Sequence, residues 1–175
     1  MNRHAIALGT LSFVVVAALV YAVNRWADGG GDGFVGLGPR ISDINVVLEV
    51  LLVLGLTFGM RLARAGNIEA HRRNQTIWVL ANAALVAMIM VPSLVRGGPG
   101  GLTNPAHALA WVTWLHATIG IATLVAGVWL VLQMNDVLPA RWHTARWKTL
   151  MRTTLAGYWL VALLGLVTYW LWYRA

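Results

Sequence analysis

The sequence predicts an all-α, polytopic membrane protein with five transmembrane helices. Of its 175 residues, 59% are hydrophobic and 11% are charged, whereas charged residues make up about a quarter of a soluble domain. Five apolar stretches each approach or exceed the ~20 residues that a helix needs to cross ~30 Å of hydrocarbon. None of the five alternates apolar and polar residues as a barrel strand does, so the spans are predicted to be helices.

The first stretch, Ala5–Val23, follows Arg3 in the manner of a signal peptide. Its apolar run is longer than the ~7–15 residues of a usual signal peptide, so we expect an uncleaved anchor, with residues 1–38 forming this helix and an outer loop. Residues 39–175 are expected to form a four-helix membrane core. Its predicted spans are Ile44–Leu62, Ile77–Val95, Ala108–Met134 and Leu150–Tyr173.

The basic residues predict the orientation. With the N-terminus inside, nine Lys and Arg residues fall on the cytoplasmic side and four on the other, which is the asymmetry of the positive-inside rule. We therefore expect an N-in, C-out, multi-pass protein of the bacterial cytoplasmic membrane, with loops 63–76 and 135–149 in the cytoplasm. This asymmetry also accounts for the net charge of +7 without a nucleic-acid partner.

Cysteine is absent. Its absence excludes disulfides, thiolate metal sites and covalent attachment of a c-type haem. Any cofactor must therefore depend on His, Met, Glu or Asn side chains, and haem b and copper are the candidates. The sequence has no Gly-x-Ser-x-Gly motif, no Walker loop and no His-Glu-x-x-His motif, so a conventional enzyme is not predicted.

Two polar side chains lie inside the predicted spans at similar depth. Glu49 is about two turns into its span, with Asn45 four residues earlier on the same face. His116 lies ~15 Å into the fourth span, on a stripe of small and polar residues that should face the bundle interior. We expect Glu49 and His116 to meet there directly or through one water, as candidate metal ligands. The alternative is a wet or protonated Glu49 without a function.

Two further histidines are predicted at the cytoplasmic rim. His71 begins a polar stripe on the third span, and His143 begins one on the fifth. If these faces meet, the two imidazoles lie roughly 4 Å apart around a metal ion, or about twice that distance across a haem. We therefore take His71, His143 and His116 as candidate cofactor ligands, and the same three with Glu49 as candidate metal ligands. The alternative for the rim histidines is a lipid headgroup contact or a hydrogen-bonded cap, and His107 is expected at the opposite rim.

From Pro39 onward, the order of the motifs resembles the CtaM-like membrane proteins, a family catalogued as domain of unknown function 420. The matching motifs are Asn45-x-x-x-Glu49, Gly66-Asn67-Ile68-Glu69-Ala70-His71-Arg72-Arg73, Leu115-His116, His143-Thr144-Ala145-Arg146-Trp147, Tyr158-Trp159-Leu160 and Gly165-x-x-x-Tyr169. The resemblance implies a four-helix core and a role in the maturation of haem–copper oxidases. Relatives usually carry a further Tyr-His where this chain has Met90-Val91-Pro92-Ser93-Leu94, and they lack the helix at residues 5–23.

Three functions are compatible with these features. The first, which the resemblance implies, is an accessory or maturation factor of a respiratory haem–copper oxidase or related electron-transfer complex, with haem or metal held by histidines. The second is a b-type haem electron carrier. The third is a structural packing subunit of a larger energy-transducing membrane complex. The expected partners are the lipid bilayer and other membrane protein subunits.

Overall fold

The computed structural model describes residues 33–34, 38–95 and 108–174, together with scattered positions between residues 7 and 22. The described chain is helical: α2 (Arg40–Arg64), α3 (Ile68–Leu85), a π-helical turn η1 (Val86–Met90), α4 (Val91–Val95), α5 (Ala108–Met134), a 3₁₀ turn η2 (Ala140–Trp142) and α6 (Trp147–Arg174). The predicted first span, its flanking loop, the 96–106 loop and His107 lie mainly or wholly outside the described residues.

Four helical segments are long and apolar enough to cross a membrane, namely α2, α3 continued through α4, α5 and α6. Much of their surface is apolar and exposed, as expected for helices that face lipid. These segments match the four predicted core spans and indicate a multi-pass membrane protein. Their predicted helical class is confirmed, and no strand occurs in the part of the chain that the structure describes.

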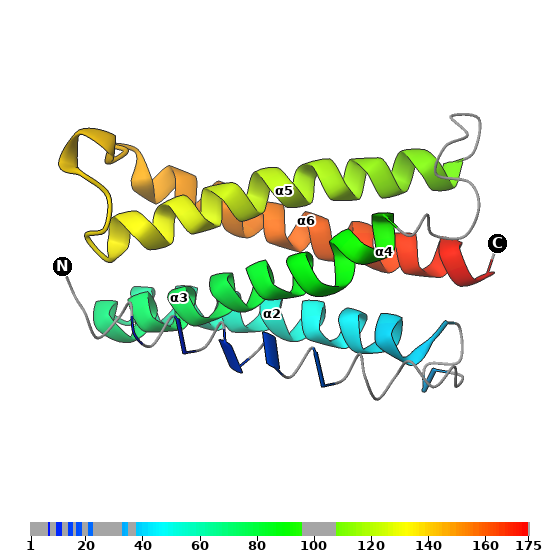
Figure 1. Cartoon of the computed structure of the whole chain (residues 1–175). Coiled ribbons are helices and arrows are strands. Elements are labelled where there is room, and N and C mark those ends of the chain that lie inside the picture. The colour runs from blue at the N-terminus through cyan, green and yellow to red at the C-terminus, as the bar shows by residue number, and fades with distance from the viewer. Residues whose placement is uncertain are drawn as a thin grey trace.

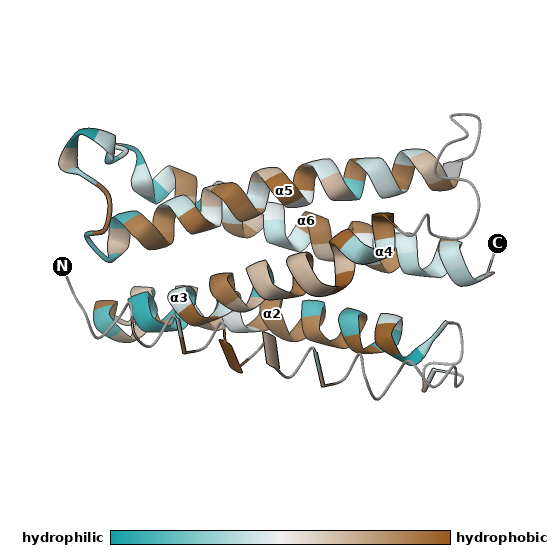
Figure 2. Cartoon of the chain, in the orientation of Figure 1, coloured by the Kyte–Doolittle hydropathy of each residue, from teal (hydrophilic) through white to brown (hydrophobic). Residues whose placement is uncertain are grey.

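The four segments form a bundle of two antiparallel hairpins (Figure 1). Helix α2 packs against α3, and α5 packs against α6; α2 also packs on α6, and α3 on α5. The α2–α3 turn and the α5–α6 loop therefore lie at one end of the bundle, where both connections carry hydrophilic residues (Figure 2). We call this the basic end, because it carries Arg61, Arg64, Arg72, Arg73, Arg141, Arg146, Lys148 and Arg152.

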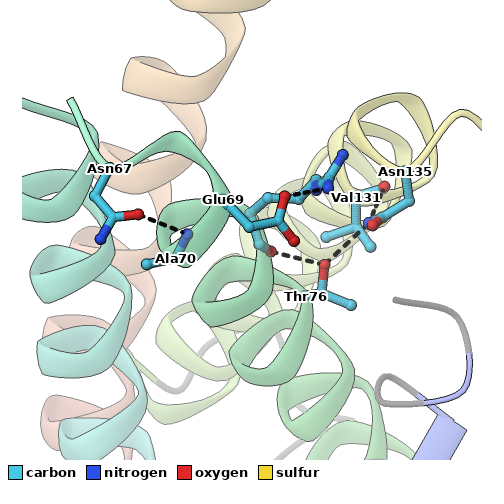
Figure 3. Close-up of polar contacts among 7 residues, drawn as sticks. Asn67, Glu69, Ala70, Thr76, Val131 and Asn135 are labelled. Atoms are coloured by element: carbon cyan, nitrogen blue, oxygen red, sulfur yellow. Dashed lines mark hydrogen bonds and ion pairs between the residues drawn. The ribbon is translucent and has the colours of Figure 1, made fainter. Parts of the chain in front are cut away.

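Helices α2, α3 and α6 begin earlier than the apolar stretches indicate, and the first two starts have a local cause. Helix α3 starts at Ile68 because Asn67 caps it, its side-chain oxygen accepting a hydrogen bond of 3.1 Å from the Ala70 amide (Figure 3). Helix α2 starts at Arg40, directly after Pro39. The first turns of α2 and α3 are polar, so hydropathy alone does not indicate where these two helices begin.

Helices α2 and α3 approach closely along the glycine pair of α2. A Cβ atom on Gly55 would collide with the Trp78 ring, and one on Gly59 would collide with the side-chain amides of Asn74 and Gln75. These two amides donate hydrogen bonds to α2 carbonyls, Asn74 to Gly55 at 2.8 Å and Gln75 to Leu56 at 3.0 Å. The Gly-x-x-x-Gly spacing thus permits the close approach expected of small residues in membrane helices.

A polar contact fixes α5 against α3 at the basic end. The Asn135 side-chain amide donates to the Thr76 hydroxyl at 3.0 Å and to the Val131 carbonyl at 2.8 Å (Figure 3). Near the end of α5, the Gln133 side-chain oxygen accepts a hydrogen bond of 3.0 Å from the Thr144 amide. These bonds shape the loop that carries His143.

Candidate functional site

Two cavities lie along the bundle interior. The first, of about 180 Å³, is bounded by all four segments and contains Glu49 and His116 in its wall; we call it the Glu49 cavity. The second, of about 870 Å³, lies toward the basic end and has His71 and His143 in its wall; we call it the basic-end cavity. Among the described residues, Tyr158 is the one side chain that lines both.

His71 is fixed in the wall of the basic-end cavity. It is buried, 6% exposed, and its Nδ1 donates a hydrogen bond of 2.7 Å to the Gly59 carbonyl of α2. Because a carbonyl only accepts, the proton is on Nδ1 and the lone pair is on Nε2. This Nε2 is buried and has no hydrogen-bond partner. His71 therefore has an unused nitrogen ligand on a ring that the bond to Gly59 fixes.

Other polar atoms of this cavity are also buried without partners. They are the Arg72 Nε and the Thr154 hydroxyl. Unpaired buried polar atoms are rare in proteins and call for an explanation such as a bound ligand or water. The remaining wall is apolar toward the bundle centre and mainly cationic at its edge, where Arg64, Arg72, Lys148 and Arg152 outnumber a single acidic residue, Asp136.

His143 also lines this cavity, but it does not belong to a helix. It is exposed in the loop between η2 and α6, and its Nε2 donates a hydrogen bond of 3.0 Å to the Leu138 carbonyl. The expectation that it begins the stripe of the fifth helix was wrong, because Pro139 and a positive φ of 55° at Asp136 direct the chain through a turn before α6 starts at Trp147.

Direct packing of α3 on α6 does not bring His71 and His143 together. Helices α3 and α6 are diagonal in the bundle, since each packs mainly on α2 and α5. The two histidines share one cavity because the α5–α6 loop brings His143 to its edge. Within the described residues, no three His, Asp or Glu side chains gather as a metal cluster. A joint ligand role of the two histidines stays a prediction.

Glu49 and His116 meet across the other diagonal, between α2 and α5. Measured from the point where a Cβ atom of Gly165 would stand, Glu49 Oε2 is 2.5 Å away and His116 Cε1 is 3.1 Å away. The two side chains are thus no more than 5.6 Å apart. They occupy the interior at one level, as their spacing predicted, because Gly165 of α6 leaves the space between them free.

The His116 ring is held in one orientation. Its Nδ1 donates a hydrogen bond of 3.0 Å to the Val161 carbonyl of α6, which leaves the lone pair on Nε2. Glu49 is 8% exposed and is the one acidic side chain among the described residues that line its cavity. None of these lining residues is Lys or Arg. The carboxyl group therefore has no Lys or Arg partner in the cavity wall.

The sequence analysis missed a polar contact at the end opposite the basic end. Asp43, fully buried, accepts a hydrogen bond from the Tyr169 hydroxyl, and Ser42 and Tyr173 share a hydrogen bond of 2.6 Å. These contacts join the first turn of α2 to the last turns of α6. The signal in the sequence is the Ser42-Asp43 pair itself, which lies just outside the predicted span Ile44–Leu62.

Fold and cavities together define a multi-pass helical membrane protein whose interior holds two histidine-containing cavities. No family model, curated protein or solved structure matches the chain.

Proposed function

We propose that this protein is an accessory or maturation factor of a respiratory haem–copper oxidase, and that it holds a b-type haem non-covalently in the basic-end cavity. The observation that carries the proposal is the buried, unpartnered Nε2 of His71 in the wall of an 870 Å³ cavity. The oxidase itself is suggested by the motif resemblance described above. In this role the haem is the cargo that the protein carries for the oxidase.

The cavity has the chemistry that a haem requires. An axial imidazole usually donates its second ring nitrogen to a carbonyl or carboxylate, which fixes the ring, and the His71–Gly59 bond supplies this support. A ligand cavity typically has a volume of about 300–1,000 Å³ and mostly apolar walls with a few placed polar groups. The volume and walls of the basic-end cavity fall within this description.

The cations at the cavity edge are suited to the propionate groups of a haem. Arg72 contributes a buried Nε–H without a partner, although its terminal nitrogen forms an ion pair with Glu69. Lys148 and Arg152 line the same cavity from α6. Charge-assisted hydrogen bonds from such groups to carboxylates are about twice as strong as neutral ones. A planar, apolar ligand with two carboxylates fits these walls better than a neutral lipid chain does.

Haem titration of the purified, detergent-solubilised protein tests this proposal. We expect a Soret band that saturates at one haem per chain, and its loss in His71→Ala. His143→Ala should weaken binding and convert a six-coordinate spectrum to a five-coordinate one. His116→Ala is the matched control, because His116 lines the other cavity, and it should bind haem normally. Absence of a saturable Soret band in the wild type would overturn the haem proposal and favour a packing subunit.

The role in oxidase maturation requires a separate experiment. Deletion of the gene in the native bacterium should lower the haem content of the assembled oxidase, and wild-type protein but not His71→Ala should restore it. An unchanged oxidase would contradict the maturation role. Co-purification with an assembled complex at fixed stoichiometry would favour the packing subunit instead.

The membrane orientation is part of this proposal. The asymmetry of basic residues supports a cytoplasmic position for the basic end, and with it for the haem cavity. A reporter fused after residue 175 should then be extracytoplasmic, and one inserted in the 135–149 loop should be cytoplasmic. A cytoplasmic C-terminus would refute the N-in, C-out arrangement with five spans.

A further inference from the structure

The Glu49 cavity contains a buried carboxyl group that the proposed haem site does not use. A carboxyl group lies in its wall, 8% exposed, with no Lys or Arg among the described residues around the cavity. Buried carboxylates in proteins are paired with cations, coordinate metals or become neutral. The groups that surround Glu49 indicate which of these solutions applies.

The first of these groups is His116. Its ring lies no more than 5.6 Å from the Glu49 carboxylate, and both side chains approach Gly165, where a Cβ atom would collide with the carboxylate. Its Nδ1–H is bound to the Val161 carbonyl, so the free nitrogen is Nε2. This arrangement, in which one ring nitrogen is fixed by a backbone carbonyl and the other holds a free lone pair, is the usual outer support of a metal-bound histidine.

The second group is Asn45, one turn before Glu49 on α2. Its side-chain oxygen is buried and has no hydrogen-bond partner, although Asn45 lines the same cavity. The Thr168 hydroxyl, on the turn of α6 that follows Gly165, is likewise buried without a partner. The cavity therefore holds oxygen ligands that nothing in the described protein uses, beside one imidazole and one carboxylate.

We propose that the Glu49 cavity binds a first-row transition-metal dication, Zn²⁺ or Cu²⁺, through the Glu49 carboxylate and His116 Nε2. The Asn45 side-chain oxygen and water complete the coordination. Mixed imidazole and carboxylate ligands suit these ions, whereas Mg²⁺ and Ca²⁺ take sets of six or more oxygens. The positive ion would supply the charge partner that the cavity wall lacks. This site goes beyond the proposed haem site and is separate from it.

Binding of Co²⁺ and Cu²⁺ to the purified, chelator-treated full chain tests the proposal. Co²⁺ should give visible d–d bands that saturate at one ion per chain and that Zn²⁺ abolishes by competition. Cu²⁺ should show an electron paramagnetic resonance spectrum with hyperfine splitting from a single imidazole nitrogen. A wild-type protein that is folded by circular dichroism but gives no saturable Co²⁺ signal would overturn the proposal, leaving a water-filled cavity.

Substitutions locate the ion. Glu49→Gln and His116→Gln should each weaken Co²⁺ binding at least tenfold, and Asn45→Ala should weaken it less. Gly165→Ala tests the same space without removing a ligand, since its Cβ would stand 2.5 Å from Glu49 Oε2, and it should also reduce binding. Unchanged binding in Glu49→Gln and His116→Gln would show that the ion is held elsewhere.

The histidines of the basic end provide the matched controls. His71→Ala and His143→Ala should keep the Co²⁺ signal, while His71→Ala loses the Soret band. If the Co²⁺ signal depends on His143 instead, the metal is bound at the surface loop and the inference fails. Haem binding without metal binding refutes this inference alone, and metal binding without haem binding refutes the proposed haem site alone.

Discussion

The contact between α5 and α6 at Gly157 allows a quantitative test of the packing. A Cβ atom on Gly157 would lie 2.6 Å from the Thr123 hydroxyl oxygen and 3.2 Å from its methyl carbon. Unstrained heavy-atom contacts are about 3.5–4.0 Å, so Gly157→Ala must move the helices apart by roughly 1 Å or force Thr123 out of its rotamer. Thr123 is 7% exposed and branched at Cβ, and thus has little freedom to rotate away.

Gly120 provides the matched control at the same interface. A Cβ atom there would meet only Val161, at an ordinary 3.6 Å. Replacing a helical Gly by Ala stabilises a helix by roughly 0.5–1 kcal/mol in either case, whereas overpacking costs about 1–3 kcal/mol. We therefore expect Gly120→Ala to be more stable than the wild type, and Gly157→Ala to be about 1–3 kcal/mol less stable than Gly120→Ala.

Reversible unfolding in mixed micelles by SDS titration, followed by tryptophan fluorescence, measures this difference in the free energy of unfolding. Adding Thr123→Ala to Gly157→Ala should relieve the clash, so the two substitutions should couple favourably in a double-mutant cycle. Equal stability of Gly157→Ala and Gly120→Ala, or an absence of coupling with Thr123, would refute the view that this contact sets the distance between α5 and α6.

The same titration tests three further contacts. Asn67→Ala removes the side chain that caps the Ala70 amide and should lower the free energy of unfolding by about 0.5–2 kcal/mol. Asn67→Asp should be close to the wild type, and an equal loss in both variants would contradict a capping role. Gly66 has a φ of +79° and open space around it. Gly66→Ala should therefore lower the free energy of unfolding by roughly 1–2 kcal/mol through backbone strain alone, and an unchanged stability would rule out that strain. Tyr169→Phe removes a hydrogen-bond donor to the fully buried Asp43 and should lower the free energy of unfolding by about 1–3 kcal/mol. An unchanged unfolding midpoint would show that the Tyr169 bond does not contribute to stability.

The sequence predicted which faces of the helices turn inward. The stripe through Thr113, His116 and Gly127 faces the bundle interior, as does the stripe through Thr154 and Tyr158. This success has a simple cause, because polar and small residues at spacings of three and four are costly toward lipid and define one side of a helix. The apolar lengths likewise determined the four core helices and the membrane class.

Only the tertiary structure decided which of these faces meet. Periodicity fixes the inward side of each helix but not its neighbours, so the diagonal approach of Glu49 and His116 across Gly165 followed from the packing of α6 between them. The same holds for His71, whose Nε2 is left without a partner because its Nδ1 reaches the Gly59 carbonyl of α2. His143 lies in a loop rather than on α6 because Pro139 and the left-handed backbone at Asp136 set the path of the chain, and such local turns leave no trace in hydropathy.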